Sequence, residues 1–348
     1  MQGLRALYDY QGRLAEWSRL VAEITPDYCS AADAPILGRE GEYSLVMEYR
    51  VALARHHQRD LLRAASLQGK QIAWSRQQAA AALAIPLDAP LDDDQCHHIR
   101  SLVASLSSLG QILEEQGNPD CVAVYKESIR DAQRIQDTAG EAIVHFNLGS
   151  AYKVIPAICN LDAAEAAYQQ SLVLHTSNDA LGRSRCIKQI GMVHHERFDE
   201  SRRQGEPAET GMEHFRAAEQ HYLGALDLCP PTALTDLAPF HNQLGILYNS
   251  VSQIERAREH CEKATEYFEQ TGDRYAAGQT RLNMAIMYLG AAERESTLAR
   301  QRDLLLRAKA YAEAALRDFK HYEGRAADRE AKTLQLLADI AEAVTKLS

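Results

Sequence analysis

The sequence has no long apolar run and no excess of positive charge. The nearest candidate for a membrane span, residues 79–87, is short and contains Pro86, so no transmembrane helix is expected. The net charge of −10 argues against a general nucleic-acid-binding protein, which needs a basic surface to displace counterions from phosphates. It also disfavours an anionic membrane surface. The N-terminal residues lack the basic-then-apolar layout of a signal peptide.

Proline and aromatic residues are sparse as well. No proline occurs from Phe240 to Ser348, and aromatic residues make up 7% of the chain. Leu, Ala, Glu, Gln and Arg dominate, so the intrinsic propensity strongly favours helix. With 348 residues, the chain is longer than one compact core usually spans. We therefore expect an all-α protein, built as two or three domains or as one extended array.

Motifs that carry chemistry are missing too. The sequence contains no Walker A, GxGxxG, GxSxG or HExxH pattern, and its seven cysteines include no CxxC. The histidine pairs at 56–57, 97–98 and 194–195 are adjacent, and adjacent helical residues point about 100° apart, so one pair cannot chelate one ion. Acidic pairs such as Glu114-Glu115 fit solvated faces. We expect no enzyme activity, cofactor or metal, and reduced thiols in a cytoplasmic protein.

A short motif recurs along the chain instead. An apolar residue precedes Gly or Ala, and a larger residue follows three positions later, as in "HNQLGILY" (241–248). The copies recur roughly every 40 residues, with one longer interval, which is typical of stacked repeats. The small residues are Gly110, Gly149, Gly191, Gly245 and Ala285.

Each copy is followed by a second motif with +4 and +3 steps, which place three mostly small residues on one helical face. Examples are Ala164-Tyr168-Ser171 and Ala257-Cys261-Ala264. Because Gly inside a helix costs about 1 kcal/mol against Ala, Gly245 either caps a helix or meets a closely packed partner. The apolar spacing continues past Gly245, which favours close packing. Gly245→Leu is then expected to cost roughly 1–3 kcal/mol.

These two motifs resemble the tetratricopeptide repeat family over about residues 100–325. The resemblance implies a right-handed α-solenoid of antiparallel helix pairs that binds a protein or peptide. The first-helix Trp of the family is missing, and insertions interrupt residues 154–160, 196–215 and 290–302. The 196–216 insertion fits either an ordered helix extension or a mobile loop. The junctions 136–142, 177–183 and 271–278 resemble the ~40-residue variant of bacterial regulators, including sensor arms of NLR-like (STAND) proteins.

The first hundred residues match the repeat poorly. We expect residues 1–95 to form degenerate helical repeats that end in a Pro/Asp linker at 84–94. Residues 96–348 then hold about five helix pairs and a C-terminal capping helix. A helix with Leu14, Trp17, Leu20 and Val21 inward is expected, and residues 45–78 read as a helical hairpin. The helix before it would begin upstream of Met1, so the chain reads as part of something longer or as an eroded repeat.

The resemblance also implies a partner-binding groove lined by first helices. The residue two positions before each small residue, directly before the Leu, Ile or Met, should face inward. Further polar and basic residues lie on the same expected stripe. Amides there can bond a peptide backbone, and the basic residues favour an acidic segment. The other interpretation is that these positions are merely solvated. The predicted groove comprises Asn147, Lys153, Arg185, Lys188, Gln189, His195, Asn242, Gln243, Asn249 and Asn283, with Ser108 as the equivalent residue in the first copy.

The leading functional hypothesis is a protein- or peptide-binding module, as the ligand-sensing arm of a larger bacterial signalling or defence protein. The alternative is a structural scaffold that mediates self-assembly or the assembly of a complex. For the groove, replacing Arg185 and Lys188 together with Glu is expected to abolish capture of an acidic partner while the fold stays intact.

Overall fold

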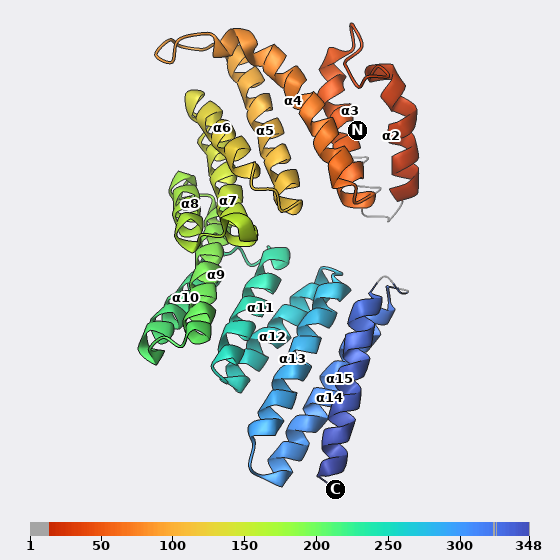
Figure 1. Ribbon diagram of the computed structural model, residues 1–348, viewed down its shortest axis with the longest axis vertical. Helices are drawn as coiled ribbons and strands as arrows, with labels where there is room; N and C mark the ends of the chain where they lie inside the picture. Colours follow the sequence, from red (N-terminus) through yellow and green to blue (C-terminus); the bar gives the residue numbers. More distant parts are fainter. Residues whose placement is uncertain (1–13, 323, 325, 348) are drawn as a thin grey trace. The chain divides into compact units, whose positions relative to one another are not determined.

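The computed structural model describes residues 14–322, 324 and 326–347. The chain divides into two compact units, residues 1–176 and 177–348, and each is described here by itself. Within the described ranges every regular element is a helix, and the one β feature is an isolated bridge between Cys29 and Pro35 (Figure 1). Successive helices pack against each other in pairs. The predicted all-α solenoid of antiparallel helix pairs is confirmed.

Several helices of unit 1 begin at a residue whose side chain caps them. Asp60, Asp92 and Asp137 each accept a hydrogen bond from the backbone N–H three residues on, which satisfies a donor that the helix leaves open. Asp92 forms a capping box with Gln95. Unit 1 contains α2 (Leu14–Tyr28), α3 (Glu40–Ala52), the π-helix η1 (Leu53–His57), α4 (Leu61–Leu83), α5 (Asp93–Glu115), α6 (Cys121–Arg134), α7 (Thr138–Val154), the 3₁₀-helix η2 (Pro156–Ile158) and α8 (Leu161–Leu174).

Unit 2 also consists of consecutive helices. The insertion at 196–215 is ordered: it lengthens two helices, and Gly205 in the left-handed region (φ 70°) ends the first of them. The insertion at 290–302 likewise lies in two long helices and a short connection. The helices are α9 (Ala180–Gln204), α10 (Ala208–Leu228), α11 (Leu234–Ser250), α12 (Ile254–Gln270), α13 (Arg274–Arg294), α14 (Leu298–Lys320) and α15 (Ala327–Lys346).

The repeat glycines lie inside helices and touch the partner helix, as the close-packing interpretation requires. A Cβ atom on Gly110 would lie 2.3 Å from the ring of Tyr125, and a Cβ on Gly245 would lie 2.3 Å from Cys261 Sγ. Gly149 and Gly191 meet Tyr168 and Tyr222 in the same way. In these four copies the middle residue of the second-helix motif, a tyrosine or Cys261, therefore occupies the space that the first helix leaves at its glycine. The helix-cap interpretation of Gly245 is wrong.

The expected boundary near residue 95 does not coincide with the division between the units. Residues 84–92 connect α4 to α5, and these two helices share one apolar cluster that includes Ile72, Ala79, Ile99 and Leu102. The Pro/Asp-rich segment is therefore a loop within a packed helix pair. The helical hairpin expected at 45–78 is present as α3, η1 and α4.

In α2, the first helix described, Trp17 and Val21 are buried and Leu20 is partly buried, as predicted from their spacing. The side chain of Leu14, also predicted to face inward, lies outside the described part. Trp17 packs edge-on against Tyr49 of α3, with ring centroids 5.0 Å apart. The helix expected before it falls outside the described residues.

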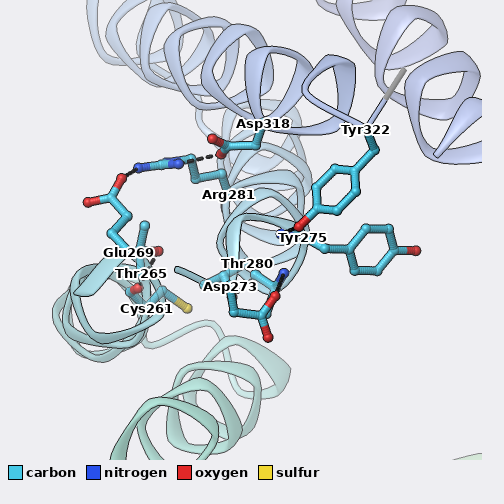
Figure 2. A network of polar contacts seen from close by, with 10 residues as sticks. Cys261, Thr265, Glu269, Asp273, Tyr275, Thr280, Arg281, Asp318 and Tyr322 are labelled. Carbon is cyan, nitrogen blue, oxygen red and sulfur yellow. Dashed lines mark hydrogen bonds and ion pairs between the residues drawn. The ribbon is translucent and has the colours of Figure 1, made fainter. Parts of the chain in front are cut away.

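A polar network joins three helices of unit 2 (Figure 2). Arg281 on α13 lies between Glu269 on α12 and Asp318 on α14, and donates hydrogen bonds to both carboxylates. Burial lowers the pKa of Arg281, but its hydrogen bonds to Glu269 and Asp318 raise it by more, so the pKa of Arg281 is raised overall. Nearby, Tyr322 accepts a hydrogen bond from the backbone N–H of Tyr275 at 2.9 Å. These contacts connect the α12–α13 junction to α14 and its C-terminal end.

Candidate functional site

In each unit, a stripe of first-helix residues faces away from the close helix–helix contact. Two positions before each repeat glycine or alanine, a residue points about 160° away from it around the helix. All five of these residues are half-buried, so they are reachable from solvent. We call them the amide stripe: Ser108 and Asn147 in unit 1, and Gln189, Gln243 and Asn283 in unit 2.

In unit 1 the amide stripe bridges neighbouring repeats. Asn147 Nδ2 on α7 donates to Ser107 Oγ on α5 at 3.3 Å. Beside this contact, α5 and α7 enclose an open, mostly apolar cavity of about 310 Å³, lined by Ser108, Gln111 and Ile143 among others. Ile143 is 55% exposed. The face between α5 and α7 therefore combines apolar surface with amide and hydroxyl groups.

His195 does not belong to this surface. Its side chain is only 7% exposed, and its Nδ1 lies 3.5 Å from Tyr222 Oη on the second helix of the pair. The reason is geometric: His195 follows Gly191 by four residues, so both lie on the same helical face. Burial lowers the pKa of His195. The prediction that His195 lines the groove is wrong.

Lys153 and Asn249 occupy the same position, four residues after Gly149 and Gly245. They are half-buried rather than buried, because both lie at or next to the last residue of their helix. In the first copy Glu114 holds this position, and it accepts hydrogen bonds from Tyr125 Oη at 2.9 Å and from Ser150 Oγ at 2.6 Å. This position mainly serves contacts within and between helix pairs.

The basic residues of unit 2 are engaged with their neighbours. Arg185 on α9 forms a two-pronged ion pair with Asp236 on α11, with distances of 2.6 and 2.9 Å. That hydrogen bonding raises the pKa of Arg185. The ammonium of Lys188 lies 6.0 Å from the ring centroid of Phe240. Arg185→Glu would remove this ion pair and place a carboxylate near Asp236, so the double replacement is expected to cost some stability as well as the positive charge.

A threonine hydroxyl of α13 meets an amide of α11 across the next repeat boundary, and two amides pair within α13. Thr280 Oγ1 donates to Asn242 Oδ1 at 3.3 Å, and Gln279 Nε2 donates to Asn283 Oδ1 at 3.1 Å. The side chains of Gln243 and Asn249 make no hydrogen bond with another residue of the described ranges, and both residues are half-buried. Unit 2 thus brings polar residues of α9, α11 and α13 to one face, where Asp236 balances the charge of Arg185.

The histidines gather between helices, not around an ion. Within the described part of the chain no group of three or more His, Cys, Asp or Glu side chains could hold a metal. His194 on α9 stacks on His221 of α10, with ring centroids 5.4 Å apart. His241 on α11 and His260 on α12 share a hydrogen bond between their Nδ1 atoms at 2.9 Å. All seven cysteines are free thiols, and no described helix is long and apolar enough to cross a membrane.

The His241–His260 pair predicts acid sensitivity of unit 2. Burial first, and then the charges of His260 and Lys263, lower the pKa of His241 from 6.5 to about 4. As the pH falls below about 6.5, His241 therefore takes up a proton in the unfolded chain, whereas in the folded chain it stays neutral down to about pH 4. Stability is present above this window and is lost on acidification through it.

Urea denaturation at several pH values checks this prediction. We expect His241→Phe, which keeps an aromatic ring beside Tyr267, to lose less stability on acidification than the parent. The burial-lowered pKa values of His195 and His260 act in the same direction, so part of the loss remains in the variant. An equal loss in both proteins would contradict the assignment to His241.

Comparison with known proteins found similarity to solved structures. No protein-family model and no curated protein matches the sequence. The crystal structure of BtubC (BKLC) from P. vanneervenii is similar, with a TM-score of 0.52 and 19% sequence identity; the match covers 74% of this chain and 92% of BtubC. At this identity the similarity shows the fold alone.

Two further solved structures match over most of their length. A Rap protein complexed with competence and sporulation factor has a TM-score of 0.43 and 11% identity, with 98% of this chain and 99% of that chain covered. A circular tandem repeat protein has a TM-score of 0.32 and 12% identity, covering 99% and 90%. With such TM-scores, neither carries an argument about this chain.

Proposed function

We propose that this chain is a protein- or peptide-binding repeat module, and that its partner lies along the amide stripe. The observation that supports this most directly is the position of the stripe. Two such half-buried polar residues in unit 1 and three in unit 2 lie opposite the close helix–helix contact, and within each unit hydrogen bonds join neighbouring first helices on this face. Stacked repeats generally present such a face to an extended partner.

The chemistry of this face suits a peptide. Amide side chains offer a donor and an acceptor, so they can bond both groups of an extended backbone. The cavity between α5 and α7, with exposed Ile143 at its edge, can accept an apolar side chain. An acidic segment is less favoured in unit 2, because Asp236 already balances Arg185.

A selection from a random peptide library against the intact chain tests the proposal. We expect peptides whose affinity falls about tenfold when two stripe amides, Gln243 and Asn283, are replaced with Ala, since each lost bond to a neutral group is worth about 0.5–1.5 kcal/mol. Replacing Gln169 of α8 and Gln270 of α12, which are exposed amides on second helices, is the matched control. Peptides that bind both variants as tightly as the parent would refute a partner on the stripe.

Two exposed leucines on α14 support the alternative, a scaffold that associates with itself. Leu298 and Leu306 lie two turns apart on that helix and are 66% and 57% exposed, which is consistent with an apolar contact. Sedimentation equilibrium distinguishes the two functions, because a strict monomer at all concentrations argues against a self-assembling scaffold. The narrower role as sensing arm of a bacterial signalling or defence protein stays a prediction from the family resemblance.

A further inference from the structure

One second-helix residue of unit 1 is larger than its counterparts in the other repeats. Ala64, Gln68 and Gln71 on α4 have the same +4 and +3 steps as the second-helix motifs. The third residue is Ser128 on α6 and Ser171 on α8. These hydroxyls donate to the carbonyls of Val103 and Ala142 on their own first helices, at 3.0 and 2.8 Å. Serine is thus sufficient at this position for the contact that the fold uses.

Gln71 makes the same contact and has an acceptor left over. Its Nε2 donates to the carbonyl oxygen of Ser44 on α3 at 3.4 Å. Because that carbonyl can only accept, the amide nitrogen must face it and the amide oxygen must point elsewhere. Gln71 is 8% exposed, and its Oε1 has no hydrogen-bond partner within the described residues. A buried acceptor without a donor is costly to the fold, so packing alone does not account for glutamine here.

Gln71 lines a polar cavity between α3, α4 and α5. The cavity has a volume of about 340 Å³, and Ser44, Glu48, Gln68 and Ser101 also line it. Its floor is ordered: Gln68 Nε2 donates to the carbonyl of Ser105 at 3.0 Å, and Gln68 Oε1 accepts from Ser108 Oγ at 3.3 Å. Among the described residues of this lining, Gln71 Oε1 is the buried side-chain acceptor that no protein donor satisfies.

The residue of fixed charge that lines this cavity is acidic, and His97 lines it as well. Glu48 lines it, is exposed, and forms no ion pair within the part of the chain that the structure describes. An adjoining cavity of about 260 Å³ shares Ser44 and Ser101 with the first and adds Glu40 and Trp74. Neither lining contains a lysine or an arginine. A cation with N–H donors therefore complements both the carboxylates and the unfilled amide oxygen.

We propose that the α3–α4–α5 cavity binds a protonated nitrogen group, either an arginine or lysine side chain of a peptide partner or a free organic amine. The bound N–H donates to Gln71 Oε1, and the carboxylate of Glu48 balances the charge. If the cation is a side chain of a peptide, this site deepens the proposed function and rests on it. Ser108 belongs to both the cavity lining and the amide stripe, so a bound peptide can reach both.

Titrations with defined probes test the site. The intact chain is titrated with acetyl-Ala-Ala-Arg-Ala-Ala-amide, with the same peptide carrying Gln instead of Arg, and with N-acetylarginine amide as the free cation. Calorimetry measures affinity, and the fluorescence of Trp74, which lines the adjoining cavity, reports position. We expect saturable binding of the Arg probes alone. A tighter fit of the pentapeptide indicates a peptide source, and equal affinities indicate a free amine.

Two substitutions and a control assign the contacts. Gln71→Ser introduces the residue of the other two repeats of unit 1, so the fold should melt at the same temperature or higher. The affinity for the Arg probes should fall about tenfold or more, as loss of a charged hydrogen bond implies. Glu48→Gln should weaken binding and reduce its salt dependence. Glu42→Gln, an exposed carboxylate of α3 outside both linings, should change neither.

The outcomes separate this site from the broader function. No saturable binding of the Arg probes, or binding that Gln71→Ser leaves unchanged, overturns the cation site. A drop in melting temperature of Gln71→Ser also overturns it, because it would show that Gln71 serves packing. Library peptides that depend on Gln243 and Asn283 but not on Gln71 would leave the proposed function standing without this site.

Discussion

Replacing Gly245 with Ala is expected to lower the free energy of unfolding by about 1–3 kcal/mol through overpacking, although Ala is the better helix former. The new Cβ would lie 2.3 Å from Cys261 Sγ and 3.3 Å from the carbonyl oxygen of Ala257. Cys261 is 4% exposed, so its sulfur has no solvent to rotate into, and the helices α11 and α12 must separate. Urea denaturation of the variant and the parent measures the loss.

Glycines elsewhere in helices provide the matched control. At Gly69 in α4 and Gly224 in α10, a Cβ atom would meet no neighbouring atom within 4 Å. Ala at these positions should therefore stabilise the fold by about 0.5–1 kcal/mol. In a double-mutant cycle, Cys261→Ala should remove part of the penalty of Gly245→Ala, because the clash is with its sulfur. If Ala at 245 stabilises as it does at 69 and 224, close contact is not the reason for this glycine.

The repeat glycines show which part of the fold the sequence could predict. A glycine inside an amphipathic pattern is unfavourable on its own, and its recurrence with a spaced second motif leaves close helix packing as the simple explanation. The structure places Tyr125, Tyr168 and Tyr222 against Gly110, Gly149 and Gly191. Local geometry and periodicity were sufficient for this prediction.

The error at His195 came from combining two helical faces. Residues two positions before the glycine lie opposite the close contact, whereas a residue four positions after it lies on the same face. Separating these positions by angle would have assigned His195 to the interior, where the structure places it beside Tyr222. The spacing of Gln71 after Ala64 was also visible in the sequence, and comparison with Ser128 and Ser171 would have singled it out.

Other features depend on tertiary contacts that sequence patterns do not reveal. Arg185 and Asp236 are far apart along the chain and meet because α9 and α11 pack together. A basic residue on a predicted surface therefore carries no information about whether its charge is already balanced. Likewise, the loop at 84–92 has the composition of a linker, and only the shared cluster of α4 and α5 shows that it lies within a packed pair.

Arg281→Met is expected to destabilise unit 2 by about 2 kcal/mol, less than the 3–5 kcal/mol typical of breaking a fully buried pair. The side chains of Arg281 and Asp318 are each 17% exposed, whereas Glu269 is half exposed and can be solvated. Met keeps most of the apolar stem, so the main loss is the cation between α12 and α14 (Figure 2). Thermal and urea denaturation give the change in the free energy of unfolding.

Arg258 is the control for Arg281, because it also pairs with two carboxylates, but Glu255 and Glu262 lie on its own helix and are 70% and 45% exposed. Arg258→Met should cost about 0.5 kcal/mol, as surface pairs do. Adding Asp318→Leu to Arg281→Met should recover much of the loss, since it removes the carboxylate left without its cation. An Arg281→Met variant no less stable than Arg258→Met would mean that this network joins α12, α13 and α14 without stabilising them, and that apolar packing alone holds this end of unit 2 together.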